Sequence, residues 1–270
     1  VCDTTKANIP DNLTLSVSNS STTKTKNHFI NAHNPSNIPP INQWVLKEQR
    51  QQTGDLDKFL KKTKTRAFIV IKNDSILYEK YFNGGAENKN QIVFSVSKAF
   101  TATLTAIAVE EGFLYLDQKV SDFIPEFANS DCKKITLRHL MGMVSGFKWN
   151  DYGSLVRLAS LYYNNNLQKF ISHNLGQEYE PETHFVYKSI TTQILGICLE
   201  KAIGKSYSKY LEEKIWKPVG MKYNAIVTLD SKKNRNTRTF GGLAITAKDL
   251  AIFGQLLLQD GIWEGKRIIP

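Results

Sequence analysis

Cysteine is scarce in this sequence, and its three cysteines, Cys2, Cys132 and Cys198, lie far apart. None belongs to a Cys-x-x-Cys pair or to a Cys/His spacing typical of metal ligands, so a structural zinc site is not expected. The sequence also has no uncharged apolar run of the roughly 18 residues that a membrane-spanning helix needs. Gly-x-Ser-x-Gly, His-Glu-x-x-His and Gly-x-Gly-x-x-Gly are absent as well. These absences argue against an α/β-hydrolase, a zinc protease and a dinucleotide-binding enzyme.

The charge balance is basic, with 35 Lys and Arg against 25 Asp and Glu and a formal net charge of +10. The basic residues are scattered along the chain. A nucleic-acid-binding surface would instead gather them in a stripe or patch, often interleaved with aromatic residues. We therefore expect a solvated, lysine-rich surface and no nucleic-acid partner.

The first 43 residues are rich in Asn, Ser, Thr and Lys and contain four prolines. Their apolar residues are too few to bury a face, so residues 1–43 are predicted to be a flexible polar tail or linker. Cys2 at the start of such a tail would suit a lipid anchor, and a chance cysteine is the alternative. The expected location is accordingly the cell envelope, periplasmic or tethered to a membrane through Cys2, or outside the cell. The cytoplasm remains the alternative.

Residues 44–270 are predicted to form one α+β domain with a helical subdomain at about 114–225. Strands are predicted over 66–72 and 76–82, joined by a short Asn-Asp-Ser turn as a β-hairpin. Apolar periodicity, capping residues and terminal glycines predict helices over 55–62, 94–111, 137–144, 167–172, 189–203, 206–216 and 247–259.

Ser95 and Lys98 are three positions apart at the start of the helix predicted over 94–111. That spacing places both side chains on one helix face, one turn apart. A serine hydroxyl becomes a good nucleophile only when a neighbouring base removes its proton, and an amine held in this way can be that base. The helix N-terminus also favours the alkoxide that forms. Because Ser and Lys are common residues, the spacing alone is more typical of an ordinary capped helix start.

Tyr187 and Ser189 stand at the start of the helix predicted over 189–203. A phenol held near a cationic Lys98 could relay a proton to or from the serine or the leaving group. An aromatic side chain packed on the core at a strand end is the structural alternative.

Several segments, in order along the chain, resemble those of the serine β-lactamase-related hydrolases. This family includes class C β-lactamases, D,D-peptidases, EstB-type esterases and 6-aminohexanoate-oligomer hydrolases. The first motif is Phe94-Ser95-Val96-Ser97-Lys98 and the second is Tyr187-Lys188-Ser189. The other matching segments are 116–120, 124–127, 135–141, 145–146, 193–196, 204–206, 216–221, 240–243 and 246–250. The resemblance covers the chain from about residue 55 to its end.

The resemblance implies a β-lactamase/transpeptidase-like fold, in which helices flank an antiparallel sheet and a helical subdomain is inserted. It implies a serine hydrolase that forms an acyl-enzyme on an amide, ester or β-lactam-like carbonyl of a small or peptide-like substrate, with no metal or organic cofactor. Ser95 would be the nucleophile, Lys98 its base and Tyr187 the acid/base partner. The residues that would contact the substrate are Ser189, Trp149, Tyr152, Gly241 and Gly242. The alternatives are a D,D-peptidase or β-lactamase proper, and a catalytically silent member with a binding role in the cell envelope.

The sequence departs from the family pattern in three places. Ser189 replaces the more usual Asn, and its shorter side chain predicts a weaker contact with Lys98. Glu182 stands where relatives often have Gly, which has more conformational freedom. The family's third motif, a Lys/His-x-Gly strand that forms part of the oxyanion hole, has no counterpart before Pro270. We therefore expect the C-terminal strands of the domain to lie outside these 270 residues, because the sheet would otherwise have an open edge.

Overall fold

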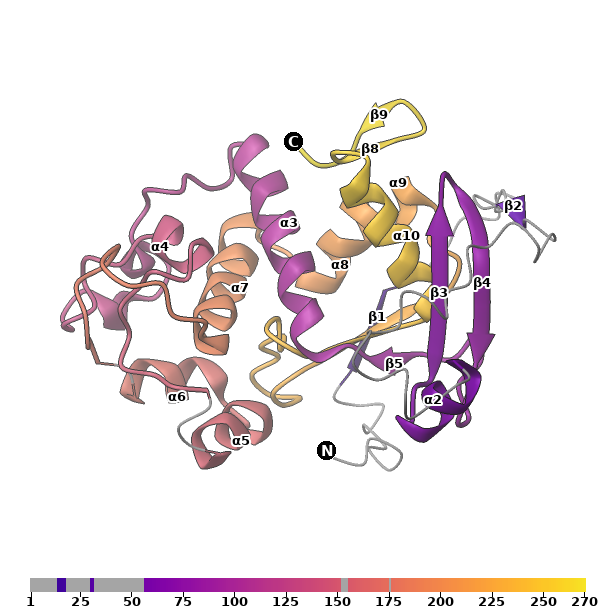
Figure 1. Ribbon diagram of the computed structural model, residues 1–270. Helices are drawn as coiled ribbons and strands as arrows, with labels where there is room; N and C mark the ends of the chain where they lie inside the picture. The colour runs from indigo at the N-terminus through magenta and orange to yellow at the C-terminus, as the bar shows by residue number, and fades with distance from the viewer. Residues whose placement is uncertain (1–13, 18–29, 32–55, 152–154, 175) are drawn as a thin grey trace.

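The computed structural model describes residues 14–17, 30–31, 56–151, 155–174 and 176–270, and these residues form helices and largely antiparallel sheets (Figure 1). The predicted α+β class is confirmed. The strands are β1 (Thr14–Val17), β2 (Ile30–Asn31), β3 (Ala67–Lys72), β4 (Ser75–Tyr81), β5 (Gln91–Ile92), β6 (Ala225–Thr228), β7 (Leu243–Ile245), β8 (Ile262–Trp263) and β9 (Lys266–Arg267). The helices are α2 (Leu56–Lys62), α3 (Ser97–Glu110), α4 (Leu137–Met141), α5 (Leu155–Tyr163), α6 (Leu167–Asn174), α7 (Ser189–Ile203), α8 (Tyr207–Leu211), α9 (Lys217–Val219) and α10 (Ala247–Leu258). A short 3₁₀ helix, η5 (Phe94–Val96), leads directly into α3.

The strands are divided among three sheets. The largest has the order β1-β6-β7-β5, and all of its neighbours are antiparallel. The second has the order β2-β4-β3 and is built on the predicted hairpin, to which β2 adds in parallel. Asn73 and Asp74 at the tip of this hairpin have φ of 49° and 59°, the left-handed conformation that a tight hairpin turn requires. Strands β8 and β9 form a separate two-stranded unit after α10.

Helix α3 lies between the helical region, which contains α4–α7, and the strands (Figure 1). Because it is covered on both sides, its buried residues occupy more than half of the helix circumference, a wider band than the stripe of a surface helix. Phe100, which is fully buried, stacks on Phe253 of α10 with 3.8 Å between ring centroids and contacts Trp216 at 6.3 Å. Rings of this size dominate the energy of a core, so this aromatic cluster fixes α3 against the C-terminal part of the chain.

Most of the predicted helices are present, with ends that differ by a few residues. The two strong apolar segments, 189–203 and 247–259, form α7 and α10 as expected. The segment predicted as 137–144 is shorter, because α4 ends at Met141 and Met143 has φ of 56°. Helix α5 was missed, although the apolar residues of 155–163 recur at helical spacing.

The expectation of a polar tail over residues 1–43 does not hold for two segments. β1 pairs with β6 from Thr14–Thr228 to Val17–Ala225, and β2 pairs with β4. Thr14-Leu15-Ser16-Val17 alternates polar and apolar residues, a sequence pattern that is typical of strands. The mean composition of a segment conceals a short pattern of this kind. Cys2 lies outside the described residues.

Within the ranges given above, no helix is both long and apolar enough to cross a membrane. Nor do the described side chains include a group of three or more His, Cys, Asp and Glu residues that could hold a metal ion.

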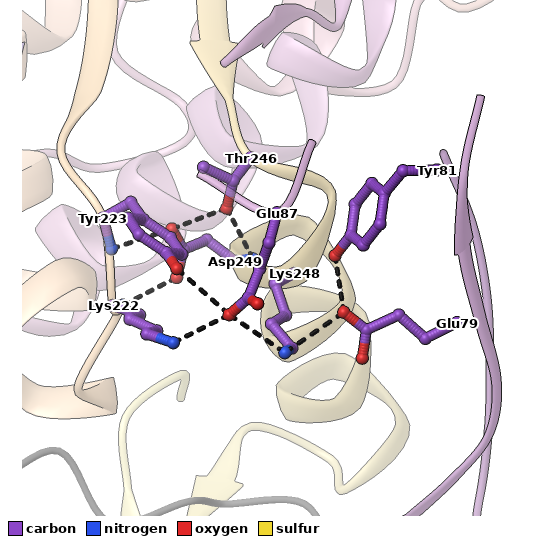
Figure 2. Close-up of polar contacts among 8 residues, drawn as sticks. All are labelled: Glu79, Tyr81, Glu87, Lys222, Tyr223, Thr246, Lys248 and Asp249. Atoms are coloured by element: carbon purple, nitrogen blue, oxygen red, sulfur yellow. Dashed lines mark hydrogen bonds and ion pairs between the residues drawn. The ribbon is translucent and has the colours of Figure 1, made fainter. Parts of the chain in front are cut away.

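A polar network joins the two larger sheets to the start of α10. Figure 2 shows Glu87, from the loop between β4 and β5, facing Lys222 and Lys248. The Glu87 Oε1 atom lies 2.7 Å from Lys222 Nζ and 3.1 Å from Lys248 Nζ, and it accepts a hydrogen bond from Tyr223 Oη at 3.0 Å. Lys248 Nζ also lies 3.1 Å from Glu79 Oε1 on β4. One carboxylate therefore connects three segments that are distant in the sequence.

Asp249 completes this junction on the backbone side. Its carboxylate accepts hydrogen bonds from the backbone N–H groups of Lys222 and Tyr223, at 2.7 and 3.0 Å, and from the hydroxyl of Thr246. Thr246 in turn caps α10 by accepting from the Asp249 N–H at 3.1 Å. Burial raises the pKa of the Asp249 carboxyl, while these hydrogen bonds act in the opposite direction.

Glu182 shows the consequence of placing a residue with a side chain where the family often has Gly. Its φ is 69°, in the left-handed region that costs an L-residue about 1–2 kcal/mol. Its Oε1 lies 3.3 Å from Nε2 of His139, whose Nδ1 accepts from the backbone N–H of Thr136 at the start of α4. The strained residue is thus tied to the capping box of α4.

We expect Glu87→Gln to weaken the junction and to change its pH dependence. The hydrogen bond from Lys222, supported by Lys248 and Tyr223, lowers the pKa of Glu87 from its ordinary value of 4.5 to about 2. This stabilisation is therefore complete above about pH 4.5 and is lost as the pH falls through about 2. Because the carboxylate is partly exposed, solvent screening limits the loss at pH 7 to about 1 kcal/mol. Thermal unfolding between pH 2 and 7 should show a Tm difference from the wild type that shrinks toward acid. A constant difference would contradict it.

The strain at Glu182 predicts an unusual order of stabilities. Glu182→Ala removes the contact with His139 and keeps the unfavourable backbone conformation, whereas Glu182→Gly removes both. The Gly variant should therefore be more stable than the Ala variant by about 1 kcal/mol. Urea unfolding of the two variants measures this difference without reference to the wild type. The ordinary order, with Ala more stable than Gly, would contradict the assignment of strain.

Candidate active site

Ser95 is positioned by a tight turn between β5 and α3. The preceding Phe94 has φ of 43°, a left-handed conformation that is rare for an aromatic residue. Leu243 of β7 holds both sides of this turn. Its carbonyl accepts from the N–H of Val93 at 2.9 Å, and its N–H donates to the Ser97 hydroxyl at 3.2 Å. The strained turn is therefore fixed, and it leaves the Ser95 side chain exposed.

Lys98 lies one turn further along and contacts Ser95 directly. Its Nζ is 2.9 Å from Ser95 Oγ and donates to the Phe240 carbonyl at 2.8 Å. The side chain is only 8 % exposed. No carboxylate among the described residues pairs with it, so its nitrogen is directed to Ser95 and Phe240. The predicted arrangement of the two residues on one face is present.

Tyr187 comes from the segment just before α7, and its ring lies next to Lys98. Lys98 Nζ lies over its ring, 5.1 Å from the centroid, and 5.8 Å from the centroid of the Phe240 ring. A cation at this distance from an aromatic face is attracted to it. The structure therefore brings Ser95, Lys98 and Tyr187 together, although 89 positions separate Lys98 from Tyr187 in the sequence.

The segment that carries Tyr187 is tied to residues 143–151 by three contacts. The Val186 N–H donates to the Met143 carbonyl at 3.0 Å, the Lys188 ammonium donates to the Phe147 carbonyl, and the Ser189 N–H donates to Asp151 Oδ2 at 2.8 Å. These contacts lie on both sides of Tyr187 and fix the direction of its side chain.

Lys188 is a buried lysine beside the proposed acid/base residue. Burial lowers the pKa of its ammonium, and the nearby carboxylates Glu178 and Asp151 oppose this effect. Its Nζ lies 3.9 Å from a Glu178 carboxylate oxygen. The residue was not recognised from the sequence, where nothing distinguishes it from the many exposed lysines.

Trp149 and Ser189 lie near the site, in positions that differ from the expectation. Trp149, predicted to offer an aromatic face to substrate, is only 3 % exposed and donates through Nε1 to Asp151 Oδ1 at 2.7 Å. Its surroundings indicate that it supports Asp151, because a buried ring has no free face. Ser189 is buried at the start of α7, and the Lys98 hydrogen bonds go to Ser95 and Phe240 instead. Tyr152 lies outside the described residues.

Gly241 and Gly242 follow Phe240 and are both buried. A Cβ at Gly242 would collide with the Thr228 hydroxyl and with the Arg238 backbone, so this glycine packs against β6. A Cβ at Gly241 would lie 2.5 Å from the hydroxyl oxygen of Tyr162. Gly241 therefore lies at the site, and Gly242 permits the close packing behind it.

Tyr162 of α5 is the site residue that the sequence did not reveal. Its ring packs edge-on against Phe240 at 4.7 Å and against Phe94 at 6.3 Å between centroids. Burial, followed by the proximity of Tyr187 and Asp151, raises the pKa of Tyr162 to about 12. Recognising α5 from its apolar spacing would have identified the helix, but no local signal identifies its neighbours across the fold.

Comparisons with known proteins agree with this architecture. The family model described as "Beta-lactamase" matches residues 56–267. The 6-aminohexanoate-dimer hydrolase of Paenarthrobacter ureafaciens is 25 % identical over 228 residues, which are 80 % of this chain and 57 % of that protein. Penicillin-binding protein 4 of Amycolatopsis lactamdurans is 26 % identical over 205 residues, covering 65 % of this chain and 52 % of that protein. The chain spans about half the length of these curated relatives.

Solved structures show the same fold. A putative 6-aminohexanoate-dimer hydrolase from Bacillus anthracis superposes with a TM-score of 0.72 and 30 % identity over 80 % of this chain and 60 % of that one. A class C beta-lactamase superposes with a TM-score of 0.54 and 22 % identity over 75 % of this chain and 62 % of that one, which shows the fold alone. The expected β-lactamase/transpeptidase-like fold is confirmed. Since the family match extends over most of the sequence, the chain belongs to the beta-lactamase family.

Proposed function

We propose that this protein is a serine hydrolase that forms an acyl-enzyme on Ser95. The observation that carries the proposal is the 2.9 Å contact between Ser95 Oγ and Lys98 Nζ, at the start of a helix and next to the Tyr187 ring. A nucleophile within hydrogen-bond reach of a base, which is itself oriented by a third group, is the arrangement of covalent catalysis. Here the Phe240 carbonyl orients Lys98.

In the first step, Ser95 Oγ attacks the substrate carbonyl carbon while Lys98 Nζ accepts the hydroxyl proton. The tetrahedral intermediate collapses as the carbon–leaving-group bond breaks, and Lys98, with Tyr187 beside it, returns the proton to the departing nitrogen or oxygen. Water then attacks the ester of Ser95, releases the carboxylic acid and restores the serine. No metal or organic cofactor enters this scheme.

The start of α3 contributes to the stabilisation of the intermediate. Ser95 is the second residue of η5, and an N–H at the beginning of a helix has no acceptor within the helix. This N–H is therefore a suitable donor for the developing oxyanion, and the helix dipole acts in the same direction.

The relatives suggest an amide as the substrate. The relatives named 6-aminohexanoate-dimer hydrolase, in sequence and in structure, make a linear amide the first substrate to test. The relatives named penicillin-binding protein and D-alanyl-D-alanine carboxypeptidase favour the peptidase or β-lactamase alternative. The location that we propose is the cell envelope or the outside of the cell, with the cytoplasm as the alternative, and the relatives named penicillin-binding protein favour the envelope.

Covalent labelling tests the proposal. A fluorophosphonate should modify Ser95 of the wild type, and Ser95→Ala should abolish the adduct. Ser97→Ala removes a neighbouring hydroxyl that is bonded to the Leu243 N–H but keeps Ser95, so the adduct should still form on Ser95, more slowly because the turn is held less firmly. Lys98→Met should slow labelling by about 100- to 10,000-fold, the range of a lost general base. Mass spectrometry of tryptic peptides identifies the modified serine.

Labelled penicillin, used in parallel, separates the substrate classes. Modification of Ser95 by fluorophosphonate alone indicates an amidase or esterase, whereas modification by penicillin as well indicates the peptidase or β-lactamase branch. Folded wild-type protein that reacts with neither reagent would overturn the enzymatic proposal and leave the catalytically silent binding protein.

A further inference from the structure

Tyr162 lies beside the Ser95–Lys98 pair without belonging to the proposed catalytic set. Its ring contacts Phe94, the residue before Ser95, and Phe240, the residue whose carbonyl accepts from Lys98. Two contacts from different parts of the chain thus place this phenol at the site.

The position of the hydroxyl group is also defined. A Cβ on Gly241 would lie 2.5 Å from the Tyr162 hydroxyl oxygen and 3.2 Å from the ring carbon that bears it. The hydroxyl therefore occupies the space that any other residue at 241 would fill. It lies against the peptide that follows Phe240.

This hydroxyl has no hydrogen-bond partner among the residues that the structure describes, and it is not one of their fully buried polar atoms, so it is open to water or to a ligand. Burial and the neighbouring Tyr187 and Asp151 hold the pKa of Tyr162 at about 12, so the phenol keeps its proton at neutral pH. An accessible donor of this kind can give its hydrogen bond to an acceptor on a ligand in place of water.

The helix end that carries Tyr162 is held in place. Arg238 Nη2 donates to the carbonyl of Asn164 at 3.1 Å, and Asn234 Nδ2 donates to the carbonyl of Asn165 at 2.7 Å. Leu167 N–H donates to Asp230 at 3.0 Å at the start of the next helix. The segment 230–238 therefore fixes the junction of α5 and α6, and the phenol is pre-organised for binding.

We propose that Tyr162 is a substrate-binding residue whose hydroxyl donates a hydrogen bond to an amide carbonyl or a carboxylate oxygen next to the scissile bond. This inference rests on the proposed function of Ser95. The substrate would then be a polyamide-like or peptide-like compound with a second acceptor near the bond that is cleaved. Exposed Phe94, Val96 and Phe185 flank Ser95 and Tyr187 in the sequence and would contact its apolar parts.

The two tyrosines have different tasks in this scheme. The Tyr187 ring faces Lys98 Nζ, so its phenol acts where protons move in the proposed reaction. The Tyr162 ring packs on the ring of Phe240, and its hydroxyl lies beside Gly241, which has no side chain. In this scheme its phenol therefore acts where substrate binds.

Matched substrates test the inference. The p-nitrophenyl esters of N-acetylglycine and of pentanoic acid have acyl chains of equal length, and only the first contains an amide group beside the ester. On the leaving-group side, 3-acetoxybenzoate and 3-methylphenyl acetate differ in a carboxylate. Tyr162→Phe should lower kcat/KM for the polar member of one pair by about 5- to 10-fold, the size of one lost hydrogen bond. It should change kcat/KM for the apolar member by less than about twofold. The pair that responds identifies the side of the scissile bond that Tyr162 binds.

Two further variants make the result specific. Tyr163→Phe removes the next phenol on the same helix, which is 85 % exposed, and should change neither pair. Gly241→Ala should lower kcat/KM for the same polar substrate, because the new methyl group displaces the Tyr162 hydroxyl. The double variant with Tyr162→Phe should show little further loss, since both substitutions remove the same interaction.

The outcomes separate this inference from the proposed function. Suppose that fluorophosphonate labels Ser95 of Tyr162→Phe at the wild-type rate, and that the ratio of kcat/KM between the polar and the apolar member is unchanged in both pairs. The inference is then overturned and the hydrolase proposal stands. An equal loss on all four substrates also overturns it, because a structural role would act in that way. If the wild type itself is not labelled, the proposed function fails and the inference fails with it.

Discussion

The segment 239–243 determines the geometry of the whole site, because it is bonded along the first two turns of α3. The Thr239 carbonyl accepts from the Thr101 hydroxyl at 3.0 Å, and the Phe240 carbonyl accepts from Lys98 at 2.8 Å. Leu243 then bonds both to Val93 before Ser95 and to Ser97 after it. A segment almost 150 positions away in the sequence therefore fixes the turn, the serine and the lysine together. If this segment moved, Ser95 and Lys98 would no longer be held in a fixed position relative to each other.

The polar interior around this segment explains why two central helices carry so many threonines. Thr101 and Thr105 on α3, and Thr191 and Thr192 on α7, are buried. Thr101 also contacts the buried Tyr207 hydroxyl at 3.1 Å, and the Thr192 carbonyl accepts from the hydroxyl of Thr239. A buried hydroxyl is tolerated only when it has a partner, so these contacts select one register between the helices and the segment. An apolar core alone would hold the helices together with less specificity.

The sequence predicted those parts of the site that depend on local spacing. Ser95 and Lys98 meet because three positions make nearly one helical turn, and the hairpin forms because Asn73 and Asp74 suit its turn. The parts that were missed depend on contacts between distant segments. Nothing in the local sequence shows that Asp151 accepts a hydrogen bond from the Ser189 N–H, or that Trp149 is buried. Nor does it show that Lys98 bonds to the Phe240 carbonyl instead of the Ser189 side chain. Resemblance to the family supplied the order of the segments, and the fold supplied their neighbours.

The site combines two parts of the fold that are held in place by different kinds of contact. The serine and the lysine stand on α3, which is fixed by the stacked Phe100 and Phe253 rings and by the β7 contacts. The tyrosines come from the helical region, where Tyr162 and Tyr187 are held by hydrogen bonds from polar loops. The proposed reaction at Ser95 needs the first part to remain rigid, because an ångström of displacement would separate Ser95 from Lys98. The second part determines what lies opposite the nucleophile, and its loops tolerate substitution more readily than a packed helix. In the proposed hydrolase, therefore, the α3 contacts would preserve the chemistry, while changes near α5 and the start of α7 would alter the choice of substrate.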